Sequence, residues 1–292
     1  MADRYPLFGP AGNSQSFGEM GYKSSLQVPE YLVKKGLNAF EYQCGRGVRV
    51  SEEMARSLGE KAAESGITLS LHAPYYISLS GTDESKRMAS LDYILQSARA
   101  VDWLGGDRIV VHSGSASKIS REEALLLAKD TLKKAQDMLD REGYGHIHMC
   151  PETMGKVNQL GTLDEVLELC TVDERLIPCV DFGHLYARTL GGIKGRDDYA
   201  AILDAIQDKL GGERAKHFHV HFSKIAYTGG GEKHHLTFAD PEYGPDFAPL
   251  AELCAERGVA PFFICESAGT QAEDARSMRL LFEEAEQKYR KD

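Results

Sequence analysis

The sequence lacks several features that would mark a particular class of protein. In its 292 residues, no run approaches the roughly 18 consecutive apolar residues that a membrane span needs. The opening stretch MADRYPLFGPAGN has no basic segment followed by an apolar one, so no targeting sequence is indicated. The six cysteines include no Cys-x-x-Cys pair, which indicates reduced thiols rather than a disulfide framework or a closed structural zinc site. We expect a cytoplasmic protein without membrane contacts.

Positive charge is scarce as well. Lys and Arg number 34 against 44 Asp and Glu, and the formal net charge of −10 excludes a protein that coats nucleic acid non-specifically. An enzyme that acts on nucleic acid stays open, because bound divalent cations can reverse the sign of the charge in one cleft. Linkers rich in proline or serine, charge blocks and residue-level repeats are also absent. We therefore expect residues 1–292 to form one domain and the protein to be a monomer.

The apolar residues follow an alternating pattern of strands and helices. Short β-branched or aromatic runs fall at residues 5–11, 37–43, 67–74, 108–114, 146–153, 177–184, 216–223 and 261–268. Long amphipathic stretches separate them, and one of these begins with Ser51 as its expected N-cap and ends at Gly66. Eight such units in one undivided chain predict an α/β fold, a single (β/α)8 TIM barrel with its active site at the C-terminal ends of the strands.

Residues that can bind metal gather at that end of the predicted strands. Six consecutive strands end in His72, His112, Glu152, Asp181 and His184, His221, and Glu266. Carboxylates mixed with imidazoles suit zinc, with manganese or iron as alternatives, and seven ligands exceed what one ion can use. We therefore predict two or three ions. Strand alternation places His146, His148, His217 and His219 deeper in the interior, where we expect them to support the ligands.

The segment after the seventh strand offers further ligands. Its sequence GGGEKHH carries Glu232 together with His234 or His235, on an expected flexible glycine hinge. A loop that returns over the barrel mouth can close a third metal position with His184. Spacing alone leaves the choice between His234 and His235 open.

Taken in order, these motifs resemble a known family. The chain carries H-A-P-Y at 72–75, V-H-S-G at 111–114, P-E-T-M-G at 151–155, D-F-G-H at 181–184, H-x-H-F-S-K at 219–224, E-x-H at 232–234 and C-E-S at 265–267. This set resembles endonuclease IV, the trinuclear-zinc apurinic/apyrimidinic endonuclease among the xylose isomerase-like TIM barrels. The resemblance runs from about the third predicted strand to the eighth. Glu232 stands where the family usually has aspartate, and the first strand lacks the histidine common there.

The resemblance implies an activity and a ligand set. It implies hydrolysis of the DNA phosphodiester 5′ to an abasic site by a metal-bound hydroxide, in base excision repair of double-stranded DNA, with Glu152 and Glu266 as catalytic carboxylates. The implied ligands are His72, His112 and Glu152 for one zinc; Glu152, Asp181, His221 and Glu266 for a second; and His184 with the acid-x-His pair for a third. Tyr75 matches a tyrosine that lies beside the flipped-out nucleotide.

Basic residues placed by the same strand-end rule form a predicted phosphate-binding rim. They are Arg46, Arg49, Lys156, Lys224 and Lys233. Two other interpretations remain. A sugar isomerase or epimerase of the same superfamily needs only Glu152, Asp181, His221 and Glu266 around one ion, and a metal-binding scaffold needs no turnover at all. Three ions per chain favour the endonuclease, and one ion favours the isomerase.

Overall fold

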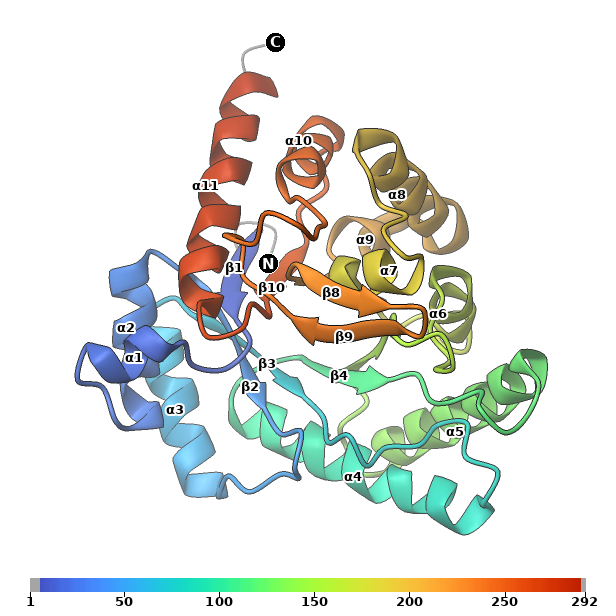
Figure 1. Cartoon of the computed structure of the whole chain (residues 1–292). Helices are drawn as coiled ribbons and strands as arrows, with labels where there is room; N and C mark the ends of the chain where they lie inside the picture. The colour runs from blue at the N-terminus through green and yellow to red at the C-terminus, as the bar shows by residue number, and fades with distance from the viewer. Residues whose placement is uncertain (1–5, 290–292) are drawn as a thin grey trace.

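The strands form a parallel barrel, as the sequence predicted. The computed structural model describes residues 6–289 and contains an eight-stranded parallel sheet in the order β1-β10-β7-β6-β5-β4-β3-β2 (Figure 1). Its strands are β1 (Leu7–Pro10), β2 (Ala39–Gln43), β3 (Thr68–His72), β4 (Arg108–His112), β5 (His148–Glu152), β6 (Cys179–Asp181), β7 (His219–Phe222) and β10 (Phe262–Cys265). A bridge between Ala11 and Glu41, with a 3.0 Å hydrogen bond from the Gly12 amide to the Glu41 carbonyl, joins the two edges. The barrel is thereby nearly closed.

Helices surround the strands in Figure 1. They are α1 (Gln15–Glu19), the short 3-10 helix η2 (Ser25–Gln27), α2 (Val28–Lys35), α3 (Glu52–Glu64), α4 (Glu84–Trp103), α5 (Arg121–Arg141), α6 (Leu163–Leu169), α7 (Phe182–Arg188), α8 (Arg196–Leu210), α9 (Gly212–Lys216), α10 (Ala248–Arg257) and α11 (Gln271–Tyr289). The Ser51 hydroxyl caps α3 by accepting from the Met54 amide, as predicted. Within the described residues, no helix has the length and apolar character that crossing a membrane requires.

The barrel interior and the layer between strands and helices are closely filled. Large apolar side chains such as Phe8, Phe182, Phe218 and Phe263 are fully or almost fully buried. All six cysteines are free and buried, which agrees with the reduced thiols expected from the sequence. Burial of this amount of apolar surface is the main favourable contribution to folding, and it fixes the strand ends that carry the candidate site.

The segment after β7 is a hairpin and not the flexible glycine loop that the sequence suggested. Strands β8 (Ile225–Thr228) and β9 (Gly231–His235) pair antiparallel, and they are drawn in orange near the centre of Figure 1. The Glu232 amide donates to the Gly155 carbonyl over 3.0 Å, which ties the hairpin to the loop that follows β5. Gly231 has a φ of +93°, and a Cβ there would overlap that carbonyl, so only glycine permits this approach.

Two of the four histidines expected in the deeper interior lie elsewhere. His146 and His217 precede the first residues of β5 and β7, so strand alternation does not reach them. The His146 ring lies 2.9 Å from Asp102 at the surface, and the His217 ring donates to the Ala260 carbonyl. Half-buried His148 donates to the Arg175 carbonyl. His219 is fully buried in the barrel, where the alternation predicted it.

Candidate metal centre

The strand ends converge on one pocket. It has a volume of about 300 Å³ and is lined by His72, Tyr75, His112, Glu152, Met154, Lys156, Gln159, His184, Glu232, His235 and Glu266. Seven of these lining residues, together with the fully buried Asp181 and His221, form three groups whose donor atoms lie within 4.8 Å of one another: His72, His112 and Glu152; Glu152, Asp181, His221 and Glu266; and His184, Glu232 and His235. Nine of the ten predicted ligands belong to these groups. The exception is His234.

Glu152 is shared by the first two groups. Its Oε2 atom lies 3.6 Å from His72 Nε2 and 3.4 Å from His112 Nε2, while its Oε1 atom lies 3.0 Å from His221 Nδ1. The side chain is 1% exposed. Burial alone would raise the pKa of Glu152, but the hydrogen bond from His221 and the nearby imidazoles of His72 and His112 hold it well below the usual range. The carboxylate therefore stays ionised between two sets of donors.

Two buried carboxylate oxygens in these groups lack a hydrogen-bond donor. Glu152 Oε2 and Asp181 Oδ2 have no hydrogen-bond partner. A buried charged oxygen without a partner costs free energy, typically more than the 1–3 kcal/mol of a neutral group. A divalent cation would satisfy both oxygens, because their neighbours are nitrogen and oxygen donors of the kind that zinc, manganese and iron bind. The side chains present fit a metal ion.

The imidazoles are oriented by hydrogen bonds on their other nitrogen. His72 donates from Nδ1 to the Ala73 carbonyl over 2.9 Å, and His184 donates from Nδ1 to the Thr153 carbonyl over the same distance. Each bond leaves Nε2 to face the pocket. Burial would lower the pKa of both rings, but nearby carboxylates raise it, to about 9 for His184, so a cation binding at Nε2 displaces a proton. Burial lowers the pKa of His112 to about 4, so this ring is neutral. Neutral, oriented imidazoles are what metal binding requires.

Glu266 and His221 complete the second group. Glu266 Oε1 lies 3.6 Å from His221 Nδ1. Burial raises the pKa of Glu266, and the nearby carboxylates of Asp181 and Glu152 add to the rise. Burial would lower the pKa of His221, but the surrounding acidic groups raise it well above its usual value. In the metal-free protein His221 is therefore protonated at both nitrogens, and a cation binding at Nδ1 displaces one proton.

A β-bulge builds the third group. Tyr227 pairs with Glu232 and Ala226 pairs with His234, so Lys233 is an extra residue in β9. The bulge shifts the alternation by one position and puts Glu232 and His235 on the same face of the hairpin. His184 Nε2 lies 3.6 Å from Glu232 Oε2, and the His184 and His235 rings are 5.6 Å apart. His234 is exposed on the other face.

The predicted basic rim is only partly assembled. Tyr75 is 57% exposed and packs its ring against His112 at 5.0 Å and His72 at 5.4 Å. Exposed Arg46 follows Gly45, whose carbonyl accepts from the Tyr75 amide, and Lys156 lines the pocket itself. The Lys224 side chain lies away from the pocket, donating to the Asp240 carbonyl and pairing with Asp246 at 3.3 Å. The exposed residues Arg49 and Lys233 are not among the residues that line the pocket.

Sequence reasoning missed Glu41. This glutamate lies in the middle of β2, is fully buried, and places its two oxygens 3.0 Å from His219 Nε2 and 3.0 Å from His221 Nε2. The sequence signal was a glutamate between two aromatic residues in a predicted strand, FEYQ, because a charged residue that is buried needs a partner. The strand-end rule does not reach this residue, since Glu41 lies inside its strand. Glu41 therefore contacts a predicted metal ligand from below the pocket.

The comparisons with known proteins agree with the barrel fold. A family model described as "Xylose isomerase-like TIM barrel" matches residues 29–287. An uncharacterized protein of Methanocaldococcus jannaschii is 31% identical over 89% of this chain and 91% of its own length. A protein named probable endonuclease 4 from Shouchella clausii is 24% identical over 73% of this chain and 75% of its own length.

Two solved structures show the same fold. Endonuclease IV from Thermus thermophilus superposes with a TM-score of 0.66 at 21% identity, covering 96% of this chain and 100% of that one. A D-tagatose 3-epimerase-like protein superposes with a TM-score of 0.67 at 19% identity, covering 98% of both chains. Overall shape therefore does not separate phosphodiester hydrolysis from sugar epimerisation, and the choice depends on the side chains at the strand ends.

Proposed function

The chain belongs to the xylose isomerase-like TIM barrel family, and we propose that within it the protein is a metal-dependent endonuclease that hydrolyses the DNA phosphodiester 5′ to an abasic site. One observation carries the proposal. Three donor groups converge on one pocket and two of them share Glu152. An epimerase needs only the four-residue group, so His72, His112 and His184 would have no reason to face the same pocket.

Each donor group would hold one ion. Glu152 would contribute one oxygen to each of the first two groups, because its oxygens face different imidazoles. The bulged hairpin would supply Glu232 and His235 to the third group with His184. All three groups mix imidazoles with carboxylates. This donor set suits zinc, with manganese or iron as alternatives. When bound, such ions supply Lewis-acid activation and neutralise phosphate charge.

The chain's own residues would position the substrate and move the proton. Glu266 lines the pocket and is the carboxylate that would accept a proton from an attacking water. The exposed Tyr75 ring offers an apolar surface at the pocket rim, against which an extruded abasic nucleotide can pack. Lys156 lines the pocket, and exposed Arg46 follows Gly45, which accepts from the Tyr75 amide, so phosphates of the strand could contact both. An abasic nucleotide has little stacking to lose, so its extrusion costs less than that of a normal one.

A duplex with one tetrahydrofuran abasic analogue tests the proposal. This analogue cannot undergo β-elimination, so cleavage reports hydrolysis. We expect a nick with a 3′-hydroxyl on one side and a 5′-phosphorylated tetrahydrofuran residue on the other. Incision should be lost on chelation and in His112→Ala, and added zinc should restore it to the chelated unsubstituted protein but not to the variant. Absence of incision by protein that holds two or three ions would contradict the endonuclease.

A single-metal sugar epimerase is the second candidate. The group Glu152, Asp181, His221 and Glu266 supports it, since two carboxylates facing one ion can shuttle protons at a carbon next to a carbonyl. Elemental analysis separates the two proposals: the epimerase needs one ion per chain, and the endonuclease two or three. Turnover of a ketose by protein with one ion, without incision of the abasic duplex, would favour the epimerase.

A further inference from the structure

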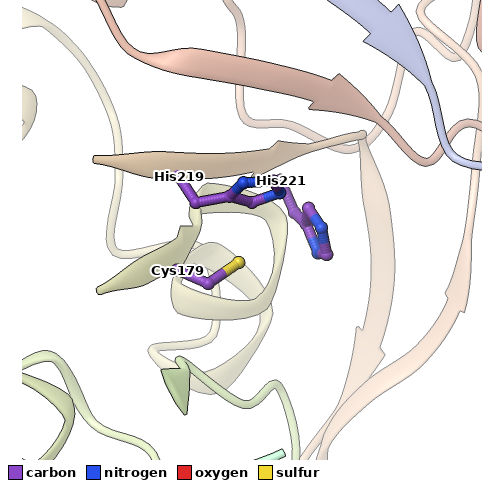
Figure 2. A group of neighbouring side chains, drawn as sticks. All are labelled: Cys179, His219 and His221. Carbon is purple, nitrogen blue, oxygen red and sulfur yellow. The ribbon is translucent and has the colours of Figure 1, made fainter. Parts of the chain in front are cut away.

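A second layer of polar side chains lies below the metal centre, deeper in the barrel. Figure 2 shows Cys179 of β6 with His219 and His221 of β7, three fully buried residues whose donor atoms lie within 4.8 Å of one another. Glu41 of β2 reaches the two histidines across the interior, with one oxygen 3.0 Å from each Nε2 atom. His221 thus belongs both to this layer and to the pocket above it.

Glu41 is surrounded by hydrogen-bond donors at this depth. The Ser70 hydroxyl donates to Oε2 over 3.1 Å, and the Gln43 amide donates to Oε1 over 3.2 Å. The same two oxygens lie 3.0 Å from His219 Nε2 and 3.0 Å from His221 Nε2. Donors around both oxygens favour the ionised carboxylate. Oε1 therefore presents negative charge to His221.

The charge fixes which nitrogen of His221 carries hydrogen. The Nε2 atom is 3.0 Å from Glu41 Oε1, although the contact is not aligned as a full hydrogen bond. A lone pair on Nε2 would face an anionic oxygen at this distance and be repelled, so Nε2 keeps its hydrogen. The opposite nitrogen, Nδ1, faces Glu152 at 3.0 Å and Glu266 at 3.6 Å. It points into the second donor group.

We propose that Glu41 is a positioning residue of the metal centre, which holds His221 as the Nε2–H tautomer and leaves Nδ1 to bind the cation. His72, His184 and His235 each meet an acceptor of their own, namely the Ala73 carbonyl, the Thr153 carbonyl and the Ser223 hydroxyl. Glu41 supplies the corresponding acceptor for His221. The inference rests on the proposed metal centre but not on DNA as the substrate.

The residues in Figure 2 do not make a separate metal site. His221 has one nitrogen facing Glu41 and the other facing Glu152. A deeper ion could bind His221 only if His221 no longer served as a ligand of the pocket above. Without His221, Cys179 and His219 remain, and Glu41 does not form a donor group with them, so too few ligands are left.

The test compares metal binding in Glu41→Gln, which keeps the volume and one acceptor, and Glu41→Leu, which removes every acceptor. Affinities come from competition with a chromophoric chelator, and metal content comes from elemental analysis. We expect one equivalent to bind about 10- to 100-fold more weakly, as is typical when the partner of a metal-bound imidazole is lost. The loss should be larger in Glu41→Leu. Long-range proton–nitrogen spectra of the zinc-loaded protein should show His221 bound through Nδ1 with hydrogen on Nε2.

Asp102→Asn is the matched control, because it removes a carboxylate from a histidine pair of 2.9 Å at the surface. It should leave all metal affinities unchanged. If Glu41→Leu fails to fold, Ser70→Ala is the deciding variant, because it removes one hydrogen bond to Glu41. It should weaken the binding of the same equivalent of metal, to a smaller extent than the Glu41 variants do. Unchanged affinities in the folded Glu41 variants, or zinc on Nε2 of His221, would overturn the proposal.

Cys179→Ser tests for a separate deep ion. We expect the same metal content as in the unsubstituted protein, and no thiolate-to-cobalt charge-transfer band after loading with cobalt. Such a band, or the loss of one equivalent, would overturn the assignment of Glu41 as a supporting residue. Incision is not a readout in these experiments. A protein that binds its ions as described but leaves abasic DNA intact would contradict the proposed function and leave the role of Glu41 standing.

Discussion

Substitution of Glu152 by glutamine is the sharpest perturbation of the proposed centre. The two oxygens of Glu152 face different donor groups, at 3.0 Å from His221 and at 3.4 Å and 3.6 Å from His112 and His72. A glutamine has one oxygen and one amide nitrogen that cannot bind a cation, so it can serve only one group. It also removes one negative charge from both.

The expected size of the effect follows from that geometry. Loss of one preorganised electrostatic contact typically costs about 2.7 kcal/mol or more in the transition state. Two ions lose support at once, and two such contributions give about 5.4 kcal/mol, or about 10⁴-fold in rate. The fold should survive, because glutamine has nearly the same volume and replaces a buried charge with a neutral group.

Single-turnover incision of the tetrahydrofuran duplex measures the rate, with elemental analysis of the same preparation and a thermal unfolding curve. Glu165→Gln is the matched control. Glu165 is another largely buried glutamate, 2.6 Å from Arg121, and it is not among the residues that line the pocket. The Glu165→Gln protein should keep the metal content and the incision rate of the unsubstituted protein. A folded Glu152→Gln protein with near-normal rate and metal content would remove Glu152 from the centre and refute the shared-ligand argument.

Three further predictions follow from the structure. His235→Ala should lower the metal content by one equivalent in elemental analysis, while His234→Ala leaves it unchanged, because the bulge turns only His235 toward His184. The opposite result would refute the assignment of His235 as the ligand. In the metal-free protein, charged neighbours raise the pKa of buried His184 from 6.5 to about 9. Protonated His184 should therefore add about 3 kcal/mol to the free energy of unfolding below pH 6.5, and this contribution should be lost as the pH rises through 9. Denaturant titrations measure it, and a free energy of unfolding that does not change over this pH range would contradict the prediction. Neutral substitutions of Arg46 and Lys156 should reduce the slope of log affinity against log salt for abasic DNA by about one unit per contact, and an unchanged slope would exclude them from the interface.

The barrel and the ligand cluster could be predicted because each depends on local pattern. The period of the apolar residues defines strands, and parallel strands bring their carboxyl ends together whatever the loops do. Six consecutive strands ended in a metal-type side chain, so the convergence of His72, His112 and Glu266 followed from topology alone. No detailed packing was needed for that step.

The hairpin could not be predicted in the same way. The sequence GGGEKHH allows either histidine to join Glu232, and alternation in a regular strand favours His234. The choice of His235 depends on how β9 pairs with β8, where one extra residue is accommodated at Lys233. A bulge arises from the pairing of two strands, so the residues of one strand do not specify it.

Glu41 shows how the alternation of strands can be extended below the ligands. The residue two positions before a ligand faces the same interior one layer deeper, and this places Ser70 below His72 and His219 below His221. Both of these polar residues contact Glu41. A glutamate buried among apolar strands would be costly, since an apolar residue of similar volume would fill the space at lower free energy. The oxygen that faces Nε2 of His221 at 3.0 Å explains why a glutamate would be kept here under the proposed role: Glu41 in the lower layer would hold the His221 imidazole in the orientation that the metal centre needs.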